Sequence, residues 1–284
     1  MSGNAYERPA MTNSHATSLP PVGRCYLVGA GPGDPELLTL KALRLIQSAT
    51  LLLADDLVSA DIVKLASTSA RIVHVGKRGG RESTSQEFIE KLMIMAARQG
   101  ELVVRLKGGD PFIFGRGGEE VEHLSRAGIA VEVVNGITAG LAAATSLGVP
   151  LTHRDHAHGV VFITGHAKPG SAGHDWQLLA STARMLELTL VIYMGVATAA
   201  VIQQQLLAGG LPASTPVALV QNASLPAQQQ ILTDLGQMTQ ALAASGLGSP
   251  CVFVVGDVVS LAASYGESLG GLMEQVQLRR AVGA

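Results

Sequence analysis

From residue 24 onward, short apolar runs alternate with segments in which apolar residues recur every three or four positions. Residues 24–28 have the length and composition of a strand, and a glycine-rich turn follows them. Residues 37–49 place Leu38, Ala42 and Ile46 on one face, which predicts a helix with one buried side. Because strands and helices alternate in this way, the pattern is typical of an α/β fold.

The remaining predicted elements continue this alternation in two halves. A helix that begins near Thr138 and is rich in alanine follows the Asn135-Gly136 turn and ends at Ser146. Two further helices are predicted in the second half, over residues 198–207 and 235–244. The further predicted strands are residues 50–54, 72–75, 102–106, 131–134, 159–164, 188–193, 216–220 and 251–255.

A chain of 284 residues is long enough for two modest domains. We expect an N-terminal α/β domain over residues 22–136 and a C-terminal α/β domain over residues 137–268, with a ligand cleft between them. Residues 1–21 are polar and lack the apolar stretch of a signal peptide, so we expect a disordered tail there. A second tail is expected over residues 269–284.

The composition predicts a large core and no membrane association. Hydrophobic residues make up 47% of the chain and charged residues 15%, which suits a sheet covered by helices on both faces. No apolar run approaches the roughly 18 residues that cross a bilayer. Cys25 and Cys251 each lie in a strand-like run, which indicates buried thiols in a reducing, cytoplasmic environment.

The charge of the chain is unevenly distributed. The net charge of −2 gives no support for nucleic-acid binding. Nine of the 20 Lys and Arg residues lie between Arg71 and Arg116, and none lies between Met185 and Leu278. One half of the protein can therefore face an anionic ligand, although the same charges are also consistent with ordinary solvated side chains.

The first candidate motif is the turn Gly29-Ala30-Gly31-Pro32-Gly33-Asp34, between a predicted strand and a predicted helix. Its position suits a dinucleotide-binding turn, in which glycines let the backbone approach a pyrophosphate. Two residues oppose that interpretation. Asp34 brings a negative charge to the place of the third glycine, and Pro32 removes a backbone N–H.

The second motif, RLKGGDPF at residues 105–112, ends another predicted strand. Gly108 and Gly109 let the backbone run against a flat ligand, and Asp110 can accept hydrogen bonds from an amine or a ribose. The alternative is a tight turn in which Asp110 caps the next helix.

Two further segments follow strands, DDLVS at residues 55–59 and VGKRGGR at 75–81. Residues just past the carboxyl ends of strands line the ligand crevice of open α/β sheets. Asp55 and Lys77 at such positions can act as base and acid, although a solvated acid and a surface lysine fit the same positions.

Together these motifs resemble the uroporphyrinogen-III C-methyltransferase family, within the wider tetrapyrrole methylases. The resemblance covers residues 23–266. The glycine-rich loops recur across the superfamily, whereas GVPLTHRD with the following TGH is more particular to the uroporphyrinogen branch. The segments that carry the resemblance are GAGPGDPELLTLKAL at 29–43, DDLVS at 55–59, VGKRGG at 75–80, VRLKGGDPFIFGRGGEE at 104–120, NGITAG at 135–140, GVPLTHRD at 148–155, FITGH at 162–166, YMG at 193–195 and QNASLPAQQ at 221–229.

The resemblance implies two α/β domains in a homodimer, with S-adenosyl-L-methionine bound between the domains and no metal. It implies conversion of uroporphyrinogen III to precorrin-2 by methylation at C-2 and C-7, with release of S-adenosyl-L-homocysteine, for sirohaem and/or cobalamin synthesis. Asp55 matches the family's proton acceptor and Lys77 its proton donor. The positions that match the family's cofactor contacts are Pro32, Gly108, Gly109, Asp110, Ile113, Thr138, Ala139, Met194 and Ala223.

Asp56 departs from the family pattern, because relatives often carry Arg there, and it leaves open whether Asp55 or Asp56 is the base. Some family members are fused to a dehydrogenase–ferrochelatase domain. The length of this chain leaves no room for such a domain, so no NAD-dependent or chelatase activity is expected.

The implied substrate carries acetate and propionate groups, and basic side chains can bind these carboxylates. Charge-assisted hydrogen bonds contribute roughly 1.5–3 kcal/mol each, so several of them can hold a polyanion. The candidates are Arg78, Arg81, Lys107, Arg116, His153 and Arg154.

Three alternatives remain open from the sequence. The first is a methylase that acts on a later corrin intermediate. The second is an NAD-dependent oxidoreductase that uses the turn at residues 29–34 for its nucleotide. The third is a non-catalytic module that senses S-adenosylmethionine.

Overall fold

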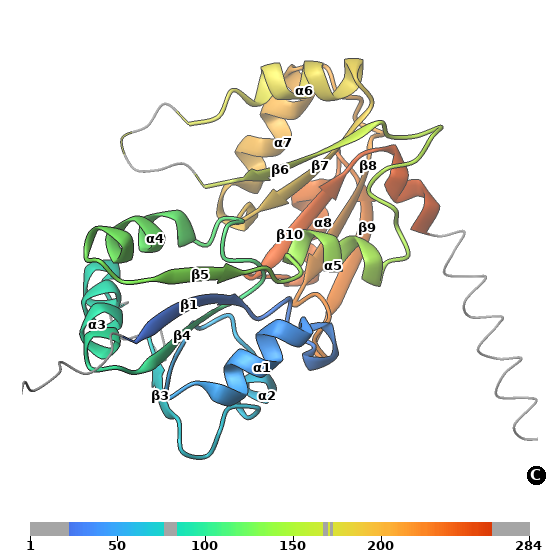
Figure 1. Ribbon diagram of the computed structural model, residues 1–284. Helices are drawn as coiled ribbons and strands as arrows, with labels where there is room; N and C mark the ends of the chain where they lie inside the picture. The colour runs from blue at the N-terminus through green and yellow to red at the C-terminus, as the bar shows by residue number, and fades with distance from the viewer. Residues whose placement is uncertain (1–22, 77–83, 167–169, 171–172, 263–284) are drawn as a thin grey trace, which may run out of the picture.

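The computed structural model describes residues 23–76, 84–166, 170 and 173–262. The chain forms two five-stranded sheets with helices packed around each (Figure 1). Both predicted tails, as well as Lys77, Arg78 and Arg81, lie outside the described residues. The predicted α/β fold is confirmed, with one sheet in each half of the chain.

The N-terminal sheet is entirely parallel, in the order β3-β2-β4-β1-β5. Parallel neighbours require crossover connections, and the connections here carry helices on both faces of the sheet. The strands are β1 (Arg24–Gly29), β2 (Leu51–Ala54), β3 (Arg71–His74), β4 (Leu102–Lys107) and β5 (Val131–Val134). The helices are η1 (Pro35–Leu37), α1 (Leu40–Ser48), α2 (Ala60–Val63), α3 (Gln86–Arg98) and α4 (Gly117–Arg126).

Local chemistry sets the starts of these helices. The side chains of Thr39, Ser59 and Ser85 each accept a hydrogen bond from the backbone N–H three residues later, at the starts of α1, α2 and α3. Helix α1 then buries Ile46 against one face of the sheet, whereas α3 buries Met93 against the other. The inner strands β1, β2 and β4 are therefore covered on both faces, as their almost continuous apolar sequences predict.

The C-terminal sheet is mixed, in the order β6-β7-β10-β8-β9. Only β6 and β7 pair in parallel, and the other pairs are antiparallel. The strands are β6 (Gly159–Thr164), β7 (Leu188–Tyr193), β8 (Pro216–Gln221), β9 (Gln229–Asp234) and β10 (Cys251–Val255). The helices of this half are α5 (Ala139–Ser146), α6 (Trp176–Met185), η2 (Val196–Thr198), α7 (Ala199–Ala208), α8 (Met238–Ser245) and η3 (Asp257–Ser260).

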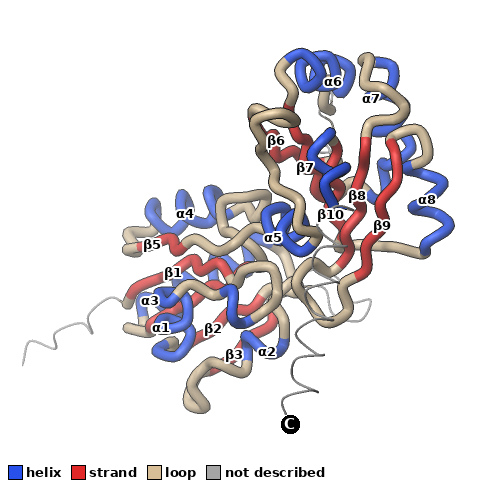
Figure 2. The backbone as a smooth tube through the Cα atoms, turned by 90° about the vertical axis from the view of Figure 1, so that its right-hand side faces the viewer, coloured by secondary structure: helices blue, strands red, loops and turns tan. Residues whose placement is uncertain are grey.

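Helix α5 lies between the two sheets in both views (Figures 1 and 2). It follows β5 directly in the sequence, yet it packs on β7 and β10 of the other sheet through Ala142 and Ala143. The junction between the halves is therefore a helix that starts at the edge of one sheet and is buried against the other. The predicted boundary at residues 136 and 137 falls just before this helix.

Both cysteines are free and buried in strands. Burial raises the pKa of the Cys25 thiol to about 12 and that of the Cys251 thiol to about 11. Across the described parts of the chain, no helix has the length and apolar character that crossing a membrane requires.

Candidate active site

Three glycine-containing loops meet at the carboxyl ends of β1, β4 and β5. Gly31 and Gly109 exchange backbone hydrogen bonds, with N···O distances of 3.1 and 2.7 Å. A Cβ built on Gly136 would lie 2.2 Å from the carbonyl oxygen of Gly109, and one on Gly29 would lie 2.4 Å from the Gly136 nitrogen. The glycines therefore let the backbones of the three loops approach one another closely.

Asp110 joins two of these loops. Its carboxylate is buried, and Oδ1 accepts a hydrogen bond from the Phe112 N–H at 2.8 Å. Oδ2 accepts from the Gly136 N–H at 3.1 Å and from the Asn135 side-chain amide at 3.2 Å. The carboxylate therefore fixes the loop after β4 to the loop after β5.

Tyr193 connects this junction to the second sheet. It is the last residue of β7, and its hydroxyl lies 2.7 Å from Thr138 Oγ1 and accepts a hydrogen bond from the Gly140 N–H at 2.8 Å. Its ring contacts that of Phe114, with 4.9 Å between the centroids. Burial raises the pKa of Tyr193, so its hydroxyl keeps its proton over the neutral range. Tyr193 is not among the site residues predicted from the sequence, although the YMG segment contains it.

A second contact between the halves involves the loop after β8. The Asp34 N–H donates to Ser224 Oγ at 3.3 Å, and a Cβ built on Gly33 would lie 2.4 Å from Leu225 Cδ2. Ser59 Oγ donates to the carbonyl of Gly33 at 2.8 Å. The loop at residues 31–34 is thereby held between residues of both halves.

The predicted cofactor residues lie on five loops that these contacts connect. Pro32 is on the loop that reaches Ser224, next to the buried Ala223. Met194 directly follows Tyr193, has a positive φ of 55° and is 48% exposed. The others, Gly108, Gly109, Asp110, Ile113, Thr138 and Ala139, lie on the loops that Gly136, Asp110 and Tyr193 join.

Two shallow hollows lie away from these loops. One borders residues 145–148, Gln230, Leu232 and Ala262, and the other borders residues 24–26 and 130–132. Neither is lined by acidic or basic side chains suited to proton transfer at the converged loops, so the contacts between those loops define the candidate site.

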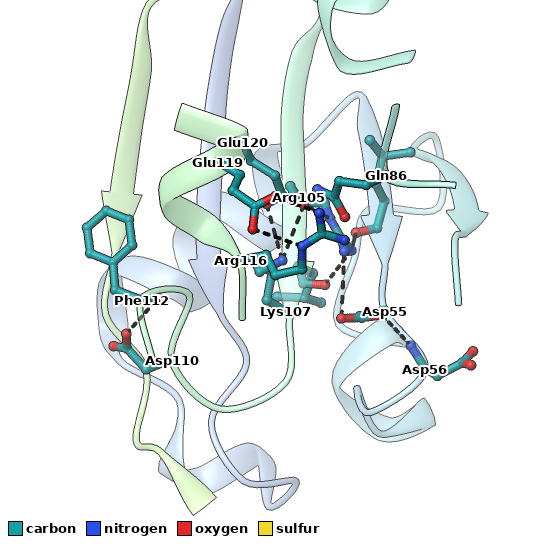
Figure 3. A network of polar contacts seen from close by, with 12 residues as sticks. Asp55, Asp56, Gln86, Arg105, Lys107, Asp110, Phe112, Arg116, Glu119 and Glu120 are labelled. Atoms are coloured by element: carbon teal, nitrogen blue, oxygen red, sulfur yellow. Dashed lines mark hydrogen bonds and ion pairs between the residues drawn. The ribbon is translucent and has the colours of Figure 1, made fainter. Parts of the chain in front are cut away.

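A cluster of charged side chains lies beside the loops, behind Asp55 (Figure 3). Arg105 Nη2 lies 3.6 Å from Asp55 Oδ2, and Arg105 Nε lies 3.2 Å from Glu120 Oε1. Lys107 Nζ lies 3.2 Å from Glu120 Oε2. The side chain of Asp55 is 34% exposed, whereas those of Arg105 and Glu120 are 3% and 0% exposed. Asp55 is therefore the member of the cluster that reaches solvent.

Asp56 has a different environment. Its N–H donates to Asp55 Oδ1 at 3.0 Å, but its own carboxylate points away from the cluster and lies against Gly76 (Figure 3). Of the two adjacent acids, only Asp55 faces Arg105. This geometry favours Asp55 over Asp56 as the acid–base residue.

Of the six basic residues expected to bind the substrate, the structure describes Lys107, Arg116, His153 and Arg154, and these four do not share one environment. Lys107 is 3% exposed and faces Glu120, so its ammonium does not project toward a ligand as expected. Burial and the nearby Arg105 lower its pKa. Lys107 is the last residue of β4 and pairs there with Glu120 of α4, so its contact with the substrate stays a prediction. Arg116 is exposed and pairs with Glu119 at 2.5 Å.

His153 and Arg154 lie at the opposite end of the second sheet from Met194. The His158 N–H donates to the carbonyl of Glu187, just before β7, whereas Met194 follows the carboxyl end of that strand. Six residues of strand span about 20 Å. The structure therefore does not bring His153 and Arg154 together with the predicted cofactor residues within this chain.

The two sheets and the loops at their junction define a two-domain α/β enzyme whose ligand site is built from the ends of strands. The family model of the Tetrapyrrole (Corrin/Porphyrin) Methylases matches the sequence over residues 24–239. The chain therefore belongs to this family.

Within that family, the chain is similar to proteins named uroporphyrinogen-III C-methyltransferase and siroheme synthase. A uroporphyrinogen-III C-methyltransferase of Pseudomonas aeruginosa is 52% identical over 236 residues, which are 83% of this chain and 94% of that protein. A siroheme synthase of Azotobacter vinelandii is 45% identical over 92% of this chain, which spans only 56% of that longer protein. A solved uroporphyrin-III C-methyltransferase of Thermus thermophilus, complexed with S-adenyl homocysteine, is 42% identical with a TM-score of 0.70, covering 84% of this chain and 100% of that one.

Proposed function

We propose that this protein is an S-adenosylmethionine-dependent methyltransferase that converts uroporphyrinogen III to precorrin-2. Two successive methyl transfers, to C-2 and C-7, release two molecules of S-adenosylhomocysteine, and the product serves sirohaem and/or cobalamin synthesis. The observation that carries the proposal is the convergence of the nine family-matched cofactor positions on connected loops, in a chain 52% identical to a uroporphyrinogen-III C-methyltransferase.

The converged loops suit a nucleoside sulfonium. Asp110 accepts three hydrogen bonds and retains lone pairs for a further donor. Met194 directly follows Tyr193 and has an apolar side chain that is 48% exposed. S-adenosylmethionine, when bound, supplies the electrophilic methyl group. The task of the loops is to align that group with the acceptor carbon, which is chiefly a matter of positioning.

Asp55 is the proposed proton acceptor. A reduced pyrrole ring that gains a methyl group at carbon becomes cationic and must then lose a proton. The Asp55 carboxylate is partly exposed, and Arg105 lies behind it at 3.6 Å. Lys77, the proposed proton donor, lies outside the described residues, but it follows Gly76, which contacts Asp56.

Arg116 is the proposed ligand of the substrate carboxylates, and Arg78 and Arg81 are further candidates. His153 and Arg154 reach the same ligand only if it extends along β7 or if the other subunit of the proposed homodimer brings them to the site. We further infer a cytoplasmic enzyme, in keeping with two free, buried thiols, that works without a metal. Among the described residues, no group of three or more His, Cys, Asp or Glu side chains is arranged to hold one.

The proposal is tested by anaerobic incubation of the protein with uroporphyrinogen III and methyl-labelled S-adenosylmethionine, followed by mass analysis of the tetrapyrrole. A gain of two labelled methyl groups is expected. An unlabelled tetrapyrrole, from protein that still binds S-adenosylhomocysteine, would reject uroporphyrinogen III as the substrate. Label in a later corrin intermediate under the same conditions would assign the alternative acceptor.

A further inference from the structure

Four charged side chains form a continuous row behind the candidate site (Figure 3). In order they are Asp55, Arg105, Glu120 and Lys107, with two negative and two positive charges. The charges of the row balance, and only Asp55 has substantial solvent contact. Burial without balance would be costly, because an unpaired charge in a protein interior loses its hydration without compensation.

Arg105 is the link between the two carboxylates. Its Nε faces Glu120 and its Nη2 faces Asp55, while Nη1 donates to the Leu53 carbonyl at 3.4 Å. A guanidinium is planar and presents its donors in a fixed fork, so fixing one edge orients the other. The edge toward Glu120 therefore determines where the edge toward Asp55 lies.

Glu120 is itself held rigidly. It lies on α4, is fully buried, and accepts a hydrogen bond from the Gln86 side chain of α3 at 2.8 Å. Gln86, Arg105 and Lys107 thus approach one carboxylate from α3 and from β4. This carboxylate touches none of the predicted cofactor positions in the described contacts, and its link to Asp55 passes through Arg105.

We infer that Glu120 is a positioning residue that, through Arg105, fixes the Asp55 carboxylate for proton transfer. The inference rests on the proposed role of Asp55. When the charge of Glu120 is lost, Asp55 is the one carboxylate of the row that remains to balance Arg105 and Lys107. Arg105 then turns from its fork geometry, and the Asp55 carboxylate loses its fixed partner. Binding of the nucleoside, which uses other loops, is unaffected.

The test compares Glu120→Gln with Glu122→Gln in the full chain. Glu122 lies on the same helix, is 65% exposed and forms an ion pair with Arg126, so it is a matched control for the loss of one carboxylate. For Glu120→Gln, kcat is expected to fall about 10- to 100-fold, the scale of a small misplacement of a reacting group. The affinity for S-adenosylhomocysteine, measured by calorimetry, is expected to change less than about twofold.

A double-mutant cycle separates positioning from a general structural effect. In an Asp55→Asn background, Glu120→Gln is expected to change the residual kcat by less than about twofold, since the residue it positions is already absent. An equal fall in both backgrounds would overturn the inference. So would a wild-type kcat for Glu120→Gln when Asp55→Asn alone is impaired. Full turnover by Asp55→Asn alone would instead remove the proposed base, and the inference with it.

Arg105→Lys carries the same test should Glu120→Gln fail to fold. Lysine keeps the charge but cannot face two carboxylates through one planar fork. Its kcat is expected to fall in the wild-type background and not in the Asp55→Asn background. An Arg105→Lys protein with wild-type kcat would overturn the inference.

Discussion

The Tyr193 hydroxyl lies 2.7 Å from Thr138 Oγ1, which joins the end of β7 to the residue that precedes α5. The same hydroxyl accepts the Gly140 N–H, so one phenol satisfies two groups at the junction of the halves. Removing it leaves a buried N–H without a partner, at a cost of about 1–3 kcal/mol.

Tyr193→Phe is therefore expected to lower the free energy of unfolding by about 1–3 kcal/mol and to weaken binding of S-adenosylhomocysteine. Urea denaturation measures the first effect and calorimetry the second. Because phenylalanine keeps the ring contact with Phe114, an unchanged affinity would show that the hydroxyl does not organise the cofactor loops.

Close backbone packing at Gly136 makes a second prediction. A Cβ there would meet the Gly109 carbonyl oxygen at 2.2 Å and the Gly29 Cα at 2.8 Å, and neither is the flexible end of a side chain. Gly136→Ala is expected to destabilise the protein by about 3 kcal/mol, the upper end of the typical cost of forced overpacking. Gly118, in α4, is the control, because a Cβ there meets nothing within 4 Å. Gly118→Ala is expected to raise stability by about 0.5–1 kcal/mol, and equal effects at both positions would contradict the packing described.

Because the pKa values of the buried thiols are raised, the free energy of unfolding is expected to fall at alkaline pH. The pKa of Cys251 is raised from 9.0 to about 11, so the folded state retains a proton that the unfolded chain releases. The contribution of this thiol is fully present below pH 9 and is lost as pH rises toward 11. Cys25 acts in the same direction, whereas the lowered pKa of Lys107 acts in the opposite one.

Cys251→Ala is accordingly expected to lessen the fall in unfolding free energy between pH 8 and pH 10, by about 1 kcal/mol. Denaturation curves at pH 8 and pH 10 give the change in unfolding free energy for each protein. The cavity left by the alanine costs the same at both pH values, so it does not affect this change. Identical slopes for variant and wild type would mean that this thiol does not stay protonated in the folded protein.

Asp110 provides a fourth prediction. Its Oδ2 accepts hydrogen bonds from two donors, Gly136 N–H and the Asn135 amide. In Asp110→Asn one carboxylate oxygen becomes an NH₂ group, and either orientation of the amide sets a donor against a donor. The expected loss is about 1–3 kcal/mol of stability, together with weaker binding of S-adenosylhomocysteine, both measured as for Tyr193→Phe. A variant with the stability of the wild type would show that the Asp110 carboxylate does not hold these two loops together.

Local pattern was sufficient for most of the fold. The apolar runs at β1, β2, β4, β7 and β10 are buried on both faces, so their sequences are almost continuously apolar. Strand β9 was missed because it is an edge strand with exposed Gln229 and Gln230 and shows no such run. The antiparallel pairing of β10 with β7 and β8 depends on tertiary connections that no local pattern contains.

The candidate site was only partly accessible from the sequence. Asp55 and Asp110 follow strands in motifs, which placed both at the correct edge of the sheet. The burial of Lys107 and its pairing with Glu120 were missed, because they depend on how α4 covers the end of β4. The position of His153 at the far end of β7 from Met194 likewise follows from the path of α5 across the second sheet.

The central claim, methylation of uroporphyrinogen III at two ring carbons, is tested most directly by locating the transferred methyl groups. The protein is incubated anaerobically with uroporphyrinogen III and ¹³C-methyl S-adenosylmethionine, and the product is analysed by ¹³C NMR. Two enriched methyl signals are expected, on C-2 and C-7 of one tetrapyrrole, and both are expected to accumulate more slowly with Asp55→Asn. Enrichment at other positions, or none in a protein that binds S-adenosylhomocysteine, would contradict it.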